Sequence, residues 1–457
     1  FAAMKLNHII LTAAKVNVAP DGLVSVSDGF EAFKCDALDM GRRLGMAVWP
    51  RVHHLDQMLA ENEALRKAYP GLVGVKAEGA IVWPMCYSNP QTQAFLDALF
   101  AAVARGLKTD TIVVWLSEIE GPAAVCQCPK CGGDPRRRFV AEARHVARAF
   151  EKARAARPGL RLLLTLSQGS YPFNLDVADA APKDATLLFY HGQMTYKTDP
   201  GELILPPSVT ELQGRGFRVG AVTMLAESHM HKGYLMVPFL TPRLARERMS
   251  EMGDRGMAVA QVFAQPNLAV PDLDIQAAAE FAWNGAGRST EEFVASWAAR
   301  RGSRDPEAVA RVVSRLEYPA RALSAAMQAG RMENAARVMA DMVTGRRVGA
   351  AGKQDPLWGF EFPAREEVAR QAAACRESAA LASAAGEAEL AAGARFLAQW
   401  MDVFERYAFV LEQRDAARRK EGVAGLMAAV DGLRPARDAW VARLPLVEAV
   451  RRTREVP

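Results

Sequence analysis

Two glutamates follow apolar segments of the chain at points where they could do acid–base chemistry. Glu118 comes directly after the run 111–116, and Glu227 comes shortly after the run 218–224. If both runs are strands of one barrel, and a first strand missing from the chain is counted, Glu118 lies on the fourth strand and Glu227 on the seventh, across the barrel mouth. Hydrolysis of a glycosidic bond needs such a pair: one carboxyl group protonates the leaving oxygen, and the other attacks the sugar or stabilises positive charge.

Glu120 is a further candidate, because alternation along an extended segment places it on the same side as Glu118. Glu120 would orient a substrate or replace Glu118 as the leading catalytic carboxyl group. The structural alternative for all three glutamates is a residue that caps the next helix or pairs with an arginine on the barrel rim.

Other polar and aromatic side chains near predicted strand ends would give a sugar hydrogen-bond partners and flat faces. A single histidine or tyrosine near a strand end is also common as a purely structural residue. The substrate-binding candidates are Asn7, His8, His53, Gln168, Tyr190, His191, Tyr196, Gln265 and Asn267.

Three of the six cysteines are clustered as Cys126, Cys128 and Cys131, in a turn that contains proline and glycine. Thiolates at this spacing suit a tetrahedral zinc site that needs one more ligand. Cys86 is the fourth candidate, since its loop should lie at the same end of the barrel. A sulfur-rich site suits a closed structural role rather than a catalytic one, and free thiols or a disulfide are the alternatives.

The pair His229 and His231 could bind a catalytic metal, as in barrel amidohydrolases. No companion set of histidine, aspartate and lysine appears at the other strand ends. A metal-dependent barrel hydrolase is therefore kept as an alternative, and we expect catalysis to need no cofactor.

The elements that must position these residues alternate between short β-branched runs and helical stretches, as in repeated strand–helix units with parallel pairing. This pattern predicts a (β/α)8 TIM barrel over residues 1–286. Seven strands are recognised, and we expect the missing first strand to precede residue 1, with 80–83 as the alternative eighth strand. The strands are expected at 6–12, 46–51, 111–116, 160–166, 186–190, 218–224 and 258–263, and the helices between them at 29–44, 55–68, 91–104, 137–156 and 242–252.

After residue 286 the strand pattern stops, and helical spacing continues to the C-terminus. We expect a separate all-α domain over residues 287–457. Ser289 and Asp305 look like helix starts. A helical hairpin is expected over 365–385 and 387–419, with Gly386 as the break.

Composition limits the partners of the protein. The 57 basic and 52 acidic residues give a net charge of +5 without a long block of one sign, so nucleic acid is not an expected partner. No run approaches the roughly 18 apolar residues that a membrane span needs. The first residues carry no export signal and lead almost directly into a strand, so we expect the natural protein to begin earlier. Secretion or a periplasmic location is compatible with this expectation, and the sequence sets no oligomeric state.

Four short stretches resemble barrel glycosidases, especially glycoside hydrolase families 20, 67, 84 and 163. The segment 3–8 resembles the start of the second barrel strand in family 20, and 86–90 resembles the Cys-x-x-Asn-Pro segment of family 163. The segment 116–120, with the cysteines that follow it, is similar to a family 163 strand and loop, and 280–285 is similar to the segment that closes such barrels.

The resemblance implies a glycosidase, with an N-acetylglucosamine-containing glycan as the substrate class and Glu118 as the acid. Family 20 places an aspartate before that glutamate, where this sequence has Ser117. The departure puts the acetamido-assisted mechanism of family 20 in doubt. It also keeps open a barrel that binds carbohydrate without cleaving it.

Overall fold

The computed structural model describes residues 7–12, 15–19, 21–27, 41–52, 54–78, 80, 83–106, 110–118, 125–190, 205–226, 240–264, 272–330 and 364–443. The chain divides into two compact units, and each is described by itself. The first comprises Phe1–Gly192, Leu205–Val222 and Asp254–Gln261, and the second comprises Gln193–Ile204, Thr223–Gly253 and Val262–Pro457. The domain boundary predicted at residue 286 stays a prediction.

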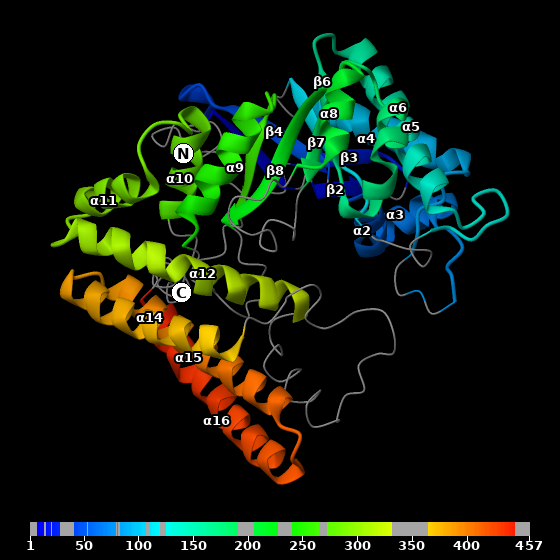
Figure 1. The fold of residues 1–457 in the computed structure, drawn as a ribbon. Coiled ribbons are helices and arrows are strands. Elements are labelled where there is room, and N and C mark those ends of the chain that lie inside the picture. Colours follow the sequence, from blue (N-terminus) through cyan, green and yellow to red (C-terminus); the bar gives the residue numbers. More distant parts are fainter. Residues whose placement is uncertain are drawn as a thin grey trace, which may run out of the picture. The chain divides into compact units, whose positions relative to one another are not determined.

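A curled parallel sheet forms the core of the first unit (Figure 1). The strands follow one another across the sheet in chain order, apart from a hairpin described below, so the expectation of repeated strand–helix units is confirmed. The strands are β1 (His8–Thr12), β4 (Ala47–Val52), β5 (Thr111–Trp115), β6 (Arg161–Leu166), β7 (Thr186–Tyr190), β8 (Arg218–Ala226) and β9 (Ala260–Ala264).

The central strands are mostly apolar because both of their faces are covered. Every residue of β5 and β7 is buried, as expected for parallel strands between a barrel interior and surrounding helices. The helices that cover the outside pack side by side in chain order. They are α4 (Pro90–Gly106), α5 (Pro135–Ala156), α6 (Asn174–Ala180) and α8 (Pro207–Gly214).

One predicted helix is two helices. The stretch expected as a single helix over 55–68 consists of α2 (Leu55–Glu61) and α3 (Glu63–Ala68). Asn62 separates them in an extended conformation, and its side chain accepts a hydrogen bond from the Leu65 amide. An asparagine favours this capping geometry over a helix interior, which explains the break.

Two features of the first unit were not predicted from the sequence. An antiparallel hairpin joins β2 (Lys15–Val18) to β3 (Val24–Ser27), and Gly22 in its turn has a φ of +85°. Two short 3-10 helices, η2 (Pro70–Leu72) and η4 (Gln168–Phe173), follow α3 and β6.

The second unit is helical over most of its described part. A helical hairpin was predicted to end at Arg419, but its second arm, α15, ends at Glu412, and Asp415 caps a further helix through the Arg418 amide. Ser289 forms a capping box with Glu292, which confirms the predicted helix start there. The helices are α9 (Pro242–Asp254), α10 (Asp272–Trp283), α11 (Thr290–Arg300), α12 (Pro306–Gly330), α14 (Arg365–Ala384), α15 (Ala388–Glu412) and α16 (Ala416–Val441).

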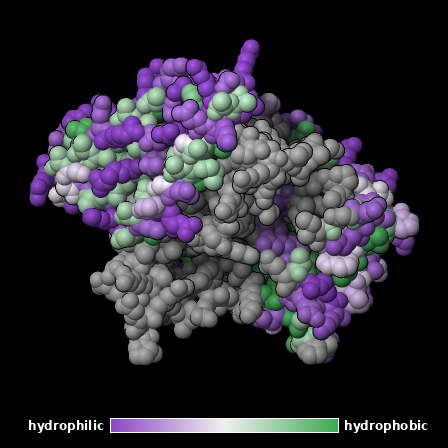
Figure 2. All heavy atoms as spheres, turned by 90° about the horizontal axis from the view of Figure 1, so that it is seen from below, coloured by the Kyte–Doolittle hydropathy of each residue, from purple (hydrophilic) through white to green (hydrophobic). Residues whose placement is uncertain are grey.

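In the coloured part of Figure 2, hydrophilic residues cover much of the face that is shown, with hydrophobic residues scattered among them. Within the described ranges, no helix combines the length and the apolarity of a membrane span.

Candidate active site

Glu118 lies at the carboxyl end of β5, where a barrel enzyme carries its chemistry. Leu116 and Ser117 are completely buried, whereas the side chain of Glu118 is 35% exposed. The chain therefore brings one carboxyl group out of the core at the end of a fully buried strand. This position agrees with the one expected from the sequence.

His54 contacts both this strand end and the Glu118 carboxyl group. Its ring is almost buried, with Nδ1 2.9 Å from the carbonyl oxygen of Leu116 and Nε2 3.5 Å from Glu118 Oε2. A carbonyl oxygen only accepts, so Nδ1 donates its proton there. Burial, helped by the nearby charge of Arg51, lowers the pKa of His54 to about 4 against the opposing effect of the Leu116 hydrogen bond.

A neutral imidazole that carries its proton on Nδ1 turns the lone pair of Nε2 toward the carboxyl group of Glu118. A nitrogen acceptor can receive a hydrogen bond only from a carboxyl group that holds its own proton. The contact between the two side chains is therefore a hydrogen bond only while the Glu118 carboxyl group is protonated.

Aromatic and cationic side chains pack together on the concave face of the sheet. The guanidinium carbon of Arg51 lies 4.5 Å from the centre of the Trp115 ring, and Trp115 contacts Tyr190 edge-on at 4.6 Å. Trp115 and Tyr190 belong to β5 and β7, which are separated by β6. Because neighbouring strands are about 4.8 Å apart, side chains two strands apart meet readily only where the sheet curls inward.

A buried polar network supports the peptide just before Glu118. The amide and hydroxyl groups of Ser117 donate to Glu142 Oε1 at 3.0 and 2.9 Å, and the hydroxyl of Ser167 donates to the Ser117 carbonyl at 2.5 Å. Glu142 lies on α5, next to an ion pair between Arg138 and Asp56. Burial raises the pKa of Glu142 to about 7, and the charge of Asp56 adds to this effect.

The side chain of Ser117 therefore faces α5 and is engaged with Glu142. This is the residue that stands where family 20 has an aspartate. A carboxylate at this position would meet Glu142.

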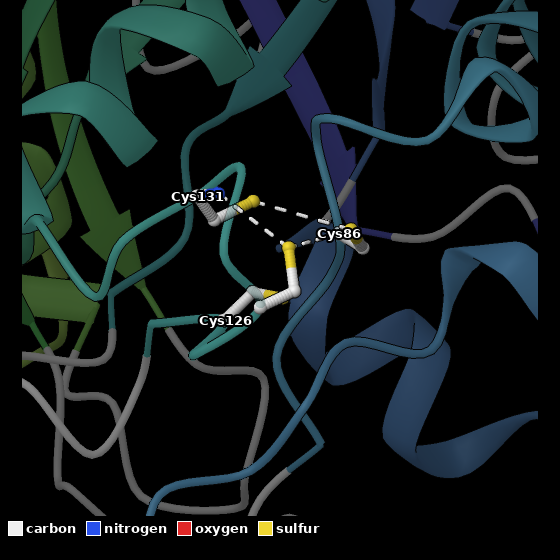
Figure 3. A group of neighbouring side chains, drawn as sticks. Cys86, Cys126 and Cys131 are labelled. Atoms are coloured by element: carbon white, nitrogen blue, oxygen red, sulfur yellow. Dashed lines mark hydrogen bonds between the residues drawn. The ribbon is translucent and has the colours of Figure 1, made fainter.

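The four predicted cysteines gather in one place (Figure 3). All four sulfur atoms lie within 4.8 Å of one another, and Cys86 Sγ is 3.9 Å from Cys128 Sγ and 4.0 Å from Cys131 Sγ. Cys86 precedes α4, whereas the other three belong to the turn before α5. The thiols are not joined by disulfides.

Three of the other predicted residues have described side chains. His8 stacks on Trp49 with 4.6 Å between the ring centres, and its Nδ1 lies 2.8 Å from Asn7 Oδ1. Tyr190 is buried against Trp115, so it helps to fill the interior.

The remaining candidates cannot be placed. Gln168 opens η4, and nothing is described of its side chain. The predicted residues outside the described ranges are His53, Glu120, His191, Tyr196, Glu227, His229, His231, Gln265 and Asn267.

Sequence reasoning missed His54, Arg51, Trp115 and Glu142. Period-two alternation along β4 would have placed Trp49 and Arg51 on one face. The pair Arg138 and Glu142 continues with Val146 along one side of α5, and that side is buried. Charges within an otherwise apolar helical stripe were thus the available signal for the network.

No protein-family model matches this chain, and a search of curated proteins finds no match. Solved structures do match. A GH138 enzyme targeting pectin rhamnogalacturonan II has a TM-score of 0.54 and 10% identity, over 96% of this chain and 56% of that one. A family GH115 4-O-methyl-alpha-glucuronidase with specificity for decorated arabinogalactans has a TM-score of 0.48 and 13% identity, over 97% of this chain and 61% of that one.

An O-GlcNAc hydrolase from Thermobaculum terrenum has a TM-score of 0.42 and 9% identity, over 93% of this chain and 86% of that one. The likeness to the GH138 enzyme confirms the resemblance to glycoside hydrolases at the level of the fold. The chain spans less than two thirds of the length of the first two.

Proposed function

We propose that this protein is a glycoside hydrolase in which Glu118 is the general acid and base. The observation that carries the proposal is the position of its carboxyl group, partly exposed at the carboxyl end of the buried strand β5 and 3.5 Å from His54 Nε2. The likeness in fold to a GH138 enzyme supports it. The substrate is then a carbohydrate.

In the proposed reaction, Glu118 protonates the glycosidic oxygen as the bond to the sugar breaks. The neutral ring of His54 accepts a hydrogen bond from the acid before this transfer and so orients the carboxyl group. Glu227 is the proposed second carboxylate, as nucleophile or as charge stabiliser, and Glu120 is the reserve candidate beside Glu118. Both lie outside the described residues.

The proposal includes the complete architecture predicted from the sequence. Seven strands of a curled sheet lie in the expected order, and we propose that they belong to the eight-stranded barrel predicted from the sequence. The catalytic barrel would extend to residue 286, and the helical domain would cover 287–457.

For the substrate class we propose a glycan that contains N-acetylglucosamine. Ser117 argues against the acetamido-assisted route of family 20, because its side chain is engaged with Glu142 and bears no charge. The proposed chemistry rests on carboxylates alone and assigns no metal to the bond-breaking step. The sulfur-only cysteine cluster fits a closed structural zinc site rather than one that activates water.

The test is the variant Glu118→Gln, assayed on unactivated oligosaccharides that contain N-acetylglucosamine, with products identified by mass spectrometry. Loss of the acid should reduce turnover by at least about 100-fold, at the lower end of what general acid catalysis contributes. Glu63→Gln is the matched control, because Glu63 is exposed on α3 and pairs only with Lys67 among the contacts described for it.

Unchanged turnover in the Glu118→Gln variant would refute the assignment. Isothermal titration with the same oligosaccharides completes the experiment. Tight binding by the wild-type protein without any product would favour a carbohydrate-binding barrel over an enzyme.

A further inference from the structure

Two distances between the cysteine sulfurs are close to the edge of a zinc tetrahedron, and all four sulfurs lie within 4.8 Å of one another. Four sulfur atoms about 2.3 Å from one zinc ion lie about 3.8 Å apart along the edges of a regular tetrahedron. The separations of Cys86 Sγ from Cys128 and Cys131 Sγ are 3.9 and 4.0 Å. A disulfide needs about 2.0 Å between two sulfurs, which would draw one pair out of this arrangement.

Backbone amides point at the sulfurs, as they do in thiolate metal sites. The amide of Val75 donates to Cys126 Sγ at 3.3 Å, and the amide of Cys131 donates to Cys128 Sγ at 3.4 Å. Such hydrogen bonds stabilise negative charge on sulfur and orient the ligand. The hydroxyl of Ser88 adds a further polar contact, 3.2 Å from Cys86 Sγ.

Glycines allow the chain to approach the sulfurs closely. Gly132 and Gly133 both have a φ of +67°, in the left-handed region that ends the turn after Cys131. On the other loop, a Cβ atom at Gly74 would lie 2.9 Å from Cys126 Cβ and 3.0 Å from Cys126 Sγ. Gly74 therefore lets its own segment approach Cys126 closely, and Gly132 and Gly133 let the chain turn after Cys131.

We infer that Cys86, Cys126, Cys128 and Cys131 bind one structural zinc ion. Four thiolates in a tetrahedron are a preferred zinc set and leave no open position for substrate or water. The ion would join the loop that enters α4 to the turn that enters α5. Its task would be to hold these two loops together, and this inference stands whether or not the protein cleaves glycosides.

The first experiment uses the wild-type protein, purified without chelator or added metal. Elemental analysis should find about one zinc ion per chain. Titration with a mercurial reagent, in the presence of a colorimetric zinc indicator, should release that zinc as four thiols react. A protein that contains no metal, holds stoichiometric iron instead, or shows a disulfide among these cysteines by mass spectrometry would overturn the inference.

The second experiment removes a ligand. Cys131→Ser should lower the zinc content to well under half an ion per chain, whereas Cys375→Ala should keep it. Cys375 is a matched control because it is a buried thiol on α14, outside the cluster. Cobalt(II) exchanged into the wild-type protein should show the intense thiolate charge-transfer absorption of a four-sulfur site. A weak spectrum, typical of oxygen ligands, would contradict the assignment.

Discussion

Replacing Ser117 by aspartate should create a buried charge conflict that depends on pH. The Ser117 hydroxyl lies 2.9 Å from Glu142 Oε1, and both residues are fully buried. Two carboxylates about 3 Å apart repel by about 5 kcal/mol at an effective dielectric constant near 20. The pair escapes most of this repulsion by binding a proton, and the folded protein holds that proton more tightly than the unfolded chain does.

The loss of stability depends on the repulsion between the two carboxylates and on how far a bound proton relieves it. At pH 8 the variant Ser117→Asp should be less stable than Ser117→Asn by about 3 to 5 kcal/mol, the usual cost of an uncompensated buried charge. Between pH 9 and pH 7 its unfolding free energy should rise by about 1.4 kcal/mol for each unit by which the pH falls, because the folded state carries one additional proton. Ser117→Asn has nearly the same size and lacks the charge, so it isolates the electrostatic effect.

Urea unfolding followed by tryptophan fluorescence at several pH values measures both quantities. Equal stability of the two variants at pH 8, with equal slopes above pH 7, would refute the placement of Ser117 against Glu142. It would also reopen the question whether an aspartate at this position could face a substrate.

Two further predictions concern the same part of the molecule. Burial raises the pKa of Glu142 from 4.5 to about 7, so its contribution to stability is present at low pH and is lost as the pH rises through this interval. Glu142→Gln should therefore flatten the fall of the unfolding free energy with rising pH, measured by urea unfolding between pH 5 and pH 7.5. An unchanged dependence on pH would assign it to other groups. Gly74→Ala should lower both the zinc content and the melting temperature, because the new methyl group would lie 2.7 Å from the Pro84 carbonyl oxygen and 2.9 Å from Cys126 Cβ. Gly253→Ala is the control, since a methyl group there meets nothing within 4 Å. Equal melting temperatures for the two variants would contradict the close approach at Gly74.

The parallel sheet could be predicted from the sequence because its central strands are covered on both faces. A strand such as β5 is then apolar at every position after Thr111, and this pattern is visible in a single sequence. The β2–β3 hairpin was harder to recognise, since its two strands are short and only partly buried. Its Asp21-Gly22 turn was the available signal.

The break between α15 and α16 was not predicted from the sequence. The residues around it favour helix on both sides, and only the capping bond from the Arg418 amide to Asp415 shows where a new helix begins. Helical composition alone therefore merged the end of one helix with the start of the next.

The candidate site was predictable only as far as strand ends determine it. Glu118 could be found because a long apolar run ends just before it. His54 could not be distinguished from its neighbour His53, since the choice depends on which ring turns toward the Leu116 carbonyl. The contact of Glu142 with Ser117 depends on the rotation of α5 about its axis, which no local pattern specifies.

The order of strands in the sheet also bears on how quickly the protein can fold. The chain between the two strands of a parallel pair must be enclosed when the pair forms, so every such pairing is distant in sequence, and topologies of this kind fold slowly. Leu163 pairs with Thr186, whereas Arg51 pairs with Val113, so the β6–β7 pair closes a loop roughly a third as long as the β4–β5 pair does. The entropic advantage is about 1 kcal/mol. The sheet is therefore expected to nucleate at β6 and β7, and the strand that carries Glu118 would be added to a nucleus that already exists.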